Sequence, residues 1–334
     1  MRYCHSQIIS LLCQMTFCVT GAGGFIGSAV ASALLQRNDI VIGIDDLSAQ
    51  THHPNTRDHW SILQNHPNFH PLQLDIRSSD LAQALLDMKQ NLGDIDAVCH
   101  FAAKPGVRDS HLQFDEYNSI NVEGTKCVLA AATSAGINRV LFASSSCVYG
   151  TGSLPFVEVP PAALPKAVSH YGWTKIQGEL VTEDWSRSIP EAQAIVFRLF
   201  SVYGEHMRPD LAISIFRDHL KRGKTVPVFG QGHDSRDYTY IDDVVDAVLL
   251  GLDQFQHLNS PTSFFNVGYG QSTSTLELLQ MVADQMGQSP EVRHMPGKKE
   301  EMSATLASTS KSARELNFIA KHSLEEGLNL MFAT

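Results

Sequence analysis

The feature that most constrains this fold is a glycine-rich turn that follows a short apolar run. Residues 16–20 are predicted to form a strand, and Gly21-Ala22-Gly23-Gly24-Phe25-Ile26-Gly27 follows at once. The apolar residues of 25–36 then recur at helical spacing. Glycines at 21, 24 and 27 allow a tight turn, a close approach of the backbone to a ligand, and close packing of helix on strand. This order predicts an α/β unit with a parallel sheet.

The first half of the chain repeats this alternation of short apolar runs and helical patterns. After residue 200 the pattern changes to short strands and loops rich in Pro, Gly and Arg. We therefore predict a Rossmann-type, doubly wound parallel sheet with a smaller C-terminal substrate-binding domain. Further strands are expected at 40–44, 69–74, 97–101, 140–143 and 195–199, and helices at 117–135, 173–181, 242–252 and 275–286.

An acidic residue at the end of the second expected strand limits which dinucleotide can bind. The carboxylate of Asp45 can accept hydrogen bonds from the hydroxyls of an adenosine ribose and would repel a 2′-phosphate. The helix that follows the glycines offers its N–H groups and positive dipole end to phosphates. These features predict NAD as a bound cofactor, rather than NADP.

The change of pattern also predicts domain boundaries. Residues 15–200 are expected to form the NAD-binding domain, to which 238–265 return. Residues 201–237 and 266–334 are expected to form the smaller domain. We expect residues 1–14 to be a poorly ordered extension, because their apolar stretch is short and runs directly into a strand that the fold needs.

A second motif, Tyr171-Gly172-Trp173-Thr174-Lys175, supplies candidate chemistry. On a helix, Tyr171 and Lys175 are one turn apart on one face. An ammonium near a phenol favours the phenolate, so we expect Lys175 to lower the pKa of Tyr171. An ionised Tyr171 can take a proton from a substrate hydroxyl while hydride leaves the same carbon. Ser145 or Ser146, just after an expected strand, can orient that hydroxyl.

With these motifs in this order, residues 15–330 resemble the extended short-chain dehydrogenase/reductases, specifically the NAD-dependent nucleotide-sugar epimerases. Further support comes from His100-Phe101-Ala102-Ala103 and from Arg236-Asp237-Tyr238-Thr239-Tyr240-Ile241-Asp242-Asp243-Val244. The resemblance implies that Arg236 holds the nucleotide diphosphate, because a guanidinium suits phosphate oxygens. It implies NAD contacts at Gly21, Gly24, Phe25, Ile26, Gly27, Asp45, Asp75, Ile76, Ala102, Ala103, Asn121, Tyr171 and Lys175.

The segment Ser145-Ser146-Cys147 bears on the reaction, because it lacks the carboxylate that sugar dehydratases and decarboxylases carry there. The resemblance therefore favours epimerisation. Segments 102–108 and 198–204, with Arg208-Pro209-Asp210, are similar to UDP-glucuronate 4-epimerases. This similarity implies that UDP-glucuronate becomes UDP-galacturonate through a transient 4-keto sugar. Substrate contacts are implied at Arg108, Ser201, Arg208 and Arg236.

Some residues depart from the family pattern, and other readings stay open. Cys147 replaces a hydroxyl residue, and Lys298 stands where the family has Asp. The alternative activity is a UDP-glucose/UDP-galactose or UDP-N-acetylhexosamine 4-epimerase. An alternative of another class is a non-catalytic NAD-sensing protein on the same fold, although such proteins often lose the Tyr/Lys pair.

Composition limits the partners and the compartment. The formal net charge of −10 argues against a nucleic-acid partner. Six cysteines without CxxC pairing indicate reduced thiols in the cytoplasm. No apolar run reaches the roughly 18 residues of a transmembrane helix, so no membrane partner is expected. We predict no metal site, because His52-His53 is the single adjacent pair among 15 histidines and HExxH is absent. The resemblance implies a homodimer through helices around 117–135 and 170–187.

Overall fold

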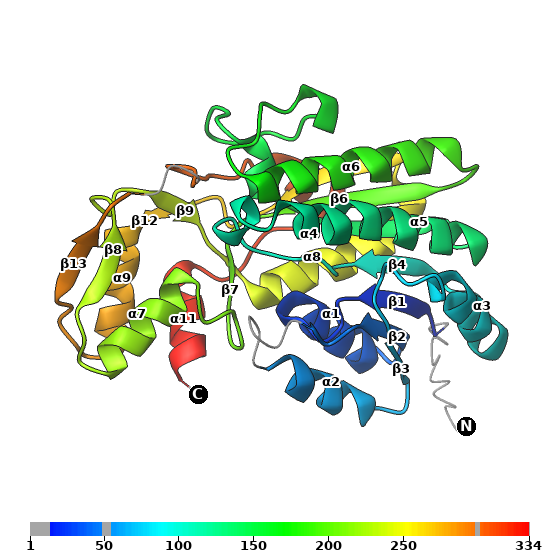
Figure 1. Cartoon of the computed structure of the whole chain (residues 1–334), viewed down its shortest axis with the longest axis horizontal. Coiled ribbons are helices and arrows are strands. Elements are labelled where there is room, and N and C mark those ends of the chain that lie inside the picture. The colour runs from blue at the N-terminus through cyan, green and yellow to red at the C-terminus, as the bar shows by residue number, and fades with distance from the viewer. Residues whose placement is uncertain (1–13, 49–54, 298–300, 334) are drawn as a thin grey trace, which may run out of the picture.

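A seven-stranded parallel sheet forms the centre of the protein (Figure 1). The structure is a computed structural model, and it describes residues 14–48, 55–297 and 301–333. The strand order 3-2-1-4-5-6, extended by one later strand, is that of a doubly wound Rossmann sheet. In spatial order the strands are β11 (Thr262–Val267), β6 (Gln193–Leu199), β5 (Arg139–Ser145), β4 (Ala97–His100), β1 (Thr16–Thr20), β2 (Ile40–Asp45) and β3 (Phe69–Gln73).

Both faces of the sheet are covered, which is why its inner strands read as continuous apolar runs. In β1, Phe17 and Val19 point into one core, whereas Cys18 points into the other. The first core is closed by α1 (Phe25–Gln36), α2 (Thr56–Gln64), α8 (Ile241–Gln254) and α10 (Ser310–Leu316). The second is closed by α3 (Leu81–Leu92), α5 (Gly124–Ser134) and α6 (His170–Ser188).

The long helix expected at 117–135 is present, but it is not uniform. It begins as α4 (Phe114–Asn118), widens into a π-helical turn at Ser119–Glu123, and continues as α5. Such π turns often occur at functional sites. Short 3₁₀ turns lie at Asp109–His111, Ser146–Tyr149, Pro161–Ala163 and Phe255–His257.

A smaller part of the molecule, at the left of Figure 1, has its own apolar core. Tyr203, Phe216, Val228, Leu279 and Leu328 belong to that core. Its helices are α7 (Ala212–Lys221), α9 (Thr275–Gln285) and α11 (Leu324–Phe332). Its paired strands are β8 (Val226–Phe229) with β13 (Val292–Met295), β9 (Ser235–Asp237) with β12 (Ser272–Ser274), and β7 (Val202–Tyr203) with β10 (Thr239–Tyr240).

The later chain is shared between the two parts. Strand β11 pairs with β6 at the edge of the main sheet. Leu316 and Phe318 also pack into the core of that sheet, although the sequence pattern grouped 266–334 with the smaller domain. The domain boundaries themselves stay a prediction. Residues 1–13, the greater part of the expected extension, lie outside the described residues.

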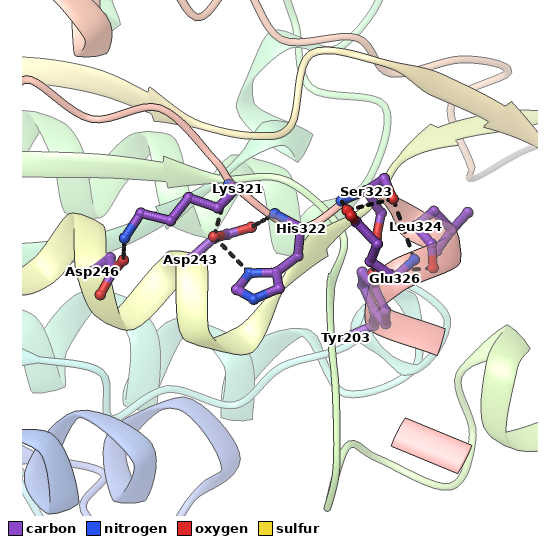
Figure 2. Close-up of polar contacts among 8 residues, drawn as sticks. All are labelled: Tyr203, Asp243, Asp246, Lys321, His322, Ser323, Leu324 and Glu326. Carbon is purple, nitrogen blue, oxygen red and sulfur yellow. Dashed lines mark hydrogen bonds and ion pairs between the residues drawn. The ribbon is translucent and has the colours of Figure 1, made fainter. Parts of the chain in front are cut away.

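Asp243 of α8 ties the C-terminal segment to the body of the protein (Figure 2). Its carboxylate is buried and accepts hydrogen bonds from the backbone N–H groups of Lys321, at 3.0 Å, and His322, at 3.1 Å. The Nδ1 atom of His322 lies 2.9 Å from the same carboxylate. Helix α11 then begins with a capping box formed by Ser323 and Glu326. The hydroxyl of Tyr203, in β7, donates to the carbonyls of Ser323 and Leu324 at 3.3 and 3.4 Å, so the start of α11 lies against β7.

Among the described residues, no helix is both long enough and apolar enough to cross a membrane.

We expect Asp243→Ala to lower the free energy of unfolding by about 2–4 kcal/mol, because it leaves partly buried N–H groups without their acceptor. Asp246→Ala, on the same helix, is the matched control. Its carboxylate is 41% exposed and pairs with the exposed Lys321, so the loss should be below about 0.5 kcal/mol. Chemical denaturation of both variants measures the difference, and equal losses would contradict the anchoring role.

Candidate active site

The glycine turn after β1 forms a cradle of backbone at the C-terminal edge of the sheet. Gly21 has a φ of +72°, and its N–H donates to the carbonyl of Ile44 at 2.7 Å. A Cβ on Gly21 would lie 2.7 Å from the backbone nitrogen of Ala102. A Cβ on Gly27 would overlap the carbonyl oxygen of Gly21. Both positions therefore require glycine for close packing of the turn, as the motif predicted.

Asp45 lies beside this cradle at the end of β2. Its Oδ2 accepts from the N–H of Gly23 at 2.9 Å, and its Oδ1 accepts from the N–H of Leu47 at 2.8 Å. Burial raises the pKa of Asp45, and the two N–H groups oppose that rise. Each carboxylate oxygen has a second lone pair, so the group can still accept hydrogen bonds from ribose hydroxyls.

The other residues predicted to contact NAD follow neighbouring strands or α4. Asp75 comes after β3 and pairs with Arg77, whose Nε lies 3.0 Å from Oδ1. Ile76 is buried against Gly124. The N–H of Ala102 donates to Thr20 Oγ1 at 3.2 Å. Phe25 and Ile26 open α1, Ala103 lies after β4, and Asn121 lies in the π turn.

These positions share one edge of the sheet, because the carboxyl ends of parallel strands meet there. A glycine-rich turn at the start of a helix, next to a carboxylate with spare acceptor capacity, fits a dinucleotide. The residues present therefore match the predicted cofactor. Their individual contacts stay predictions.

The candidate catalytic residues meet where β5 ends and α6 begins. Ser169 caps α6 by accepting from the N–H of Gly172 at 3.0 Å, which places Tyr171 in the first helical turn. The hydroxyl of Ser145 lies beside Tyr171 and lowers the pKa of its phenol. Ser146 is buried at the start of the following 3₁₀ turn. Of the two serines, the geometry favours Ser145 as the partner of Tyr171.

The electrostatics of Tyr171 differ from the sequence expectation. Burial raises the pKa of Tyr171, and the neighbouring Cys147 adds to the rise, while Ser145 and Arg208 lower it. Lys175 does not produce the expected lowering. Its Nζ donates to the carbonyl of Ala143 at 2.8 Å and lies 5.9 Å from the centre of the Tyr171 ring. The expected lowering of the Tyr171 pKa was wrong for the polypeptide alone. Desolvation raises this pKa, and it outweighs the Lys175 ammonium, which is hydrogen-bonded to Ala143 instead.

Lys175 itself is buried, and burial lowers its pKa to about 8, against an opposing effect of the Glu179 carboxylate. Cys147 has a thiol whose pKa is raised by burial. Its N–H donates to Ser145 Oγ at 3.2 Å, which restrains the position of that hydroxyl. Cys147 thus helps to place Ser145 through its backbone.

The predicted substrate residues form two groups. Arg208 is buried and makes a two-point contact with Asp210, with its Nε 2.9 Å from Oδ1. Arg108 and Arg236 meet at Glu301, whose oxygens lie 2.9 Å from Arg108 Nε and 3.6 Å from Arg236 Nη2. The structure thus brings Arg108 and Arg236 together.

The remaining predicted substrate residue is Ser201. Ser201 follows β6, and its carbonyl accepts from the N–H of Thr239 at 3.1 Å. Lys298 and the His52-His53 pair lie outside the described residues. Among the residues that are described, no three His, Cys, Asp or Glu side chains gather as metal ligands.

Sequence reasoning missed two features of the site. Tyr117 of α4 is fully buried and packs edge-on against Tyr171, with ring centres 6.5 Å apart. Glu179 and Arg198 form a buried ion pair, with Nη2 2.7 Å from Oε2, and Ser144 donates to Glu179. The available signal was a charged residue inside the apolar run of β6, since arginine is rarely buried without a partner.

Residues 17–268 match the sequence model of one family, described as the NAD dependent epimerase/dehydratase family. The chain belongs to this family. A UDP-glucuronate 4-epimerase of Thermodesulfobacterium geofontis is 29% identical over 315 residues, which is 93% of each chain. A UDP-glucose 4-epimerase of Mycolicibacterium smegmatis is 31% identical over 320 residues, covering 93% of this chain and 95% of the relative.

Among solved structures, the UDP-glucuronic acid 4-epimerase of Bacillus cereus, in complex with UDP-glucuronic acid and NAD, is similar with a TM-score of 0.85. It is 30% identical, and the similarity covers 96% of this chain and 98% of the other. The family and the Rossmann-type fold expected from the motifs are both confirmed.

We expect the phenol of Tyr171 to stay protonated below about pH 10 in protein stripped of dinucleotide, because a raised pKa favours the neutral form. The ultraviolet difference spectrum of wild type minus Tyr171→Phe across pH 7–11 measures it. A tyrosinate signal at pH 8 without NAD would contradict the raised pKa. A signal that appears only after NAD⁺ is added would assign the lowering to the positively charged cofactor.

Proposed function

We propose that this protein catalyses the NAD-dependent 4-epimerisation of UDP-glucuronate to UDP-galacturonate through a transient 4-keto sugar. Membership of an NAD dependent epimerase/dehydratase family supports the reaction class. The UDP-glucuronate 4-epimerases among the relatives and solved structures support the substrate. The absence of a carboxylate in Ser145-Ser146-Cys147 favours epimerisation over loss of water or carbon dioxide.

When bound, NAD supplies a reversible hydride acceptor. The chain's own part is to hold the reacting hydroxyl and move its proton. Tyr171 is the proposed base, and Ser145, which lies beside Tyr171 and lowers its pKa, is proposed to orient the same hydroxyl. Lys175 is proposed to hold a ribose hydroxyl of the cofactor, because its buried ammonium is directed at the end of β5. Arg236 and Arg108 are proposed to hold the UDP diphosphate.

The observation that carries the choice of substrate is the position of Arg208. A Cβ on Gly106 would lie 3.2 Å from Arg208 Nη2 and 3.3 Å from the hydroxyl of Tyr117, so Arg208 and Tyr117 border the same space. Tyr117 in turn packs on Tyr171. Arg208 therefore stands near the proposed base, where a sugar carboxylate would lie. Asp210 uses Nε and Nη2, and a guanidinium has five N–H donors, so a second carboxylate can bind.

The second candidate is a neutral-sugar 4-epimerase, acting on UDP-glucose/UDP-galactose or a UDP-N-acetylhexosamine. The specific observation in its favour is the Arg208–Asp210 pair, which already neutralises the arginine. The UDP-glucose 4-epimerase among the relatives supports the same reading.

The deciding experiment incubates purified protein and NAD⁺ with UDP-glucuronate and, separately, with UDP-glucose, and follows the anomeric protons by NMR. We expect UDP-galacturonate from the first and little product from the second. Arg208→Ala should lower kcat/KM for UDP-glucuronate by about 100-fold, the loss of one charge-assisted contact of roughly 2.7 kcal/mol.

Arg222→Ala is the matched control, because Arg222 forms a comparable pair with Asp218 on the surface. Its kinetics should match wild type. Conversion of UDP-glucose alone would establish the neutral-sugar alternative, and formation of a UDP-pentose would mean that the enzyme decarboxylates.

We also propose a cytoplasmic homodimer formed by the faces of α4 and α6. The cysteines at 18, 99, 127 and 147 are all free thiols, which supports a reducing compartment. Leu112, Phe114 and Trp173 are 85%, 51% and 41% exposed, although they are large and apolar. Phe114 and Trp173 stack with ring centres 6.3 Å apart, beside the buried His170, so these two make one exposed apolar cluster. A second copy of this face would cover it.

Phe114→Glu should convert the dimer to a monomer in light scattering at micromolar concentration, because it places a charge in a buried apolar contact. Ile62→Glu is the control, since Ile62 is 68% exposed on α2, away from this face. A wild-type monomer, or equal effects of both changes, would refute the proposed interface.

A further inference from the structure

One buried histidine beside the cofactor cradle has no role in the mechanism so far. His100 ends β4 with only 1% of its surface exposed, and it lies between two threonines. Its Nδ1 is 2.7 Å from Thr20 Oγ1, at the end of β1, and its Nε2 is 3.0 Å from Thr125 Oγ1, in α5. Both side-chain hydroxyls are buried.

For a neutral ring, the donors and acceptors in this cluster can be arranged in only one way. Thr125 Oγ1 lies 2.7 Å from the carbonyl of Asn121, so its single proton is donated there. Toward His100 it can then only accept, and Nε2 must carry the ring proton. A neutral ring leaves Nδ1 as an acceptor, so Thr20 donates to it. Thr20 Oγ1 in turn accepts from the N–H of Ala102 at 3.2 Å.

Burial and a neighbouring positive charge keep the His100 ring neutral. Burial lowers the pKa of His100 to about 3, and the positive charge of Lys175 acts in the same direction. The Phe142 ring lies 5.7 Å from the His100 ring and 5.1 Å from Lys175 Nζ. His100 therefore stays neutral throughout the pH range in which enzymes of this kind work.

The chain of hydrogen bonds continues to the proposed base. Asn121 accepts from the N–H of Lys104 at 2.7 Å, and its Nδ2 donates to Lys104 O and to Thr174 Oγ1 at 3.0 and 3.1 Å. Thr174 Oγ1 must donate to the carbonyl of Tyr171, which lies 2.8 Å away. Every donor in this path thus has one acceptor, from the loop after β4 to the first turn of α6.

We propose that His100, as its neutral Nε2–H tautomer, is a positioning residue that holds the cofactor cradle and Tyr171 in a fixed relation. The inference rests on the proposed function, in which Tyr171 acts on a substrate carbon that faces the cofactor. His100 acts on Tyr171 through Thr125, Asn121 and Thr174. It acts on the cofactor cradle through Thr20 and Ala102. Ala102 is the residue against which Gly21 packs.

The kinetic experiment compares two buried threonines. Thr125 and Thr182 both donate to the carbonyl four residues earlier, at 2.7 Å, and both are at most 1% exposed. Thr125 also accepts from His100, so Thr125→Val removes the His100 contact and Thr182→Val is the matched control. We expect Thr125→Val to lower kcat about tenfold or more with KM for UDP-glucuronate nearly unchanged, since small misplacements of reacting groups are costly.

His100→Phe keeps the shape of the ring without its hydrogen bonds and should show the same separation of kcat from KM. Equal kcat in Thr125→Val and Thr182→Val, at equal folded fraction, would overturn the positioning role.

The tautomer can be tested without activity. In ¹⁵N-histidine NMR of the NAD-loaded wild type, the signal missing from His100→Phe should show an Nε2–H tautomer that does not titrate between pH 5 and 8. Thr125→Val should shift it toward Nδ1–H, because Nε2–H loses its acceptor. An Nδ1–H or titrating ring in the wild type would overturn the proposal. Absence of any UDP-sugar conversion by the wild type would instead refute the proposed function, and the NMR result would stand apart from it.

Discussion

The close contact of two backbone segments, after β1 and after β4, is the constraint on which the rest of this structure depends. At Gly21 the turn leaves no room for a Cβ against Ala102, and at Gly27 the helix α1 lies directly on the turn. This contact directs the start of α1 to the edge where Asp45 ends β2. Because the sheet is parallel, Ser145 at the end of β5 and Tyr171 at the start of α6 reach the same edge. A side chain at Gly21 would separate the cradle from β4.

Two paired sets of polar groups are buried near this edge, and their pairing determines position more than stability. The Glu179–Arg198 pair is entirely excluded from solvent, and such pairs often contribute little net stability. It does fix Ser144, which donates to Glu179 next to Ser145. The His100 path does the same for the turn that carries Tyr171. Asp243 plays the corresponding part for α11 in the smaller core.

The overall charge of the protein is negative, although three arginines lie at the proposed substrate site. The chain carries a formal net charge of −10, yet Arg108, Arg208 and Arg236 all lie where an anionic sugar nucleotide is proposed to bind. Each of these arginines contacts a carboxylate of the chain itself, Asp210 or Glu301. A bound anion therefore either displaces the carboxylate of Asp210 or Glu301 from its arginine or binds that arginine alongside the carboxylate. Complementarity to anions is local and does not require a basic protein.

The sequence by itself determined six of the seven strands of the main sheet and their order along the chain. The glycine spacing and the apolar periodicity placed β1 and α1 at their observed bounds, and Asp45, Tyr171 and Lys175 stand on the elements expected of them. These features are local, because turn geometry and helix or strand period depend on neighbours in the chain. Only the tertiary structure decided the pKa values and hydrogen bonds that depend on residues far apart in the sequence. Desolvation raised the pKa of Tyr171 where the motif alone predicted a lowering, the π turn placed Asn121, and strands 80 residues apart brought Thr20 to His100. Burial and long-range hydrogen bonds arise from the packed fold, so local sequence patterns do not contain them.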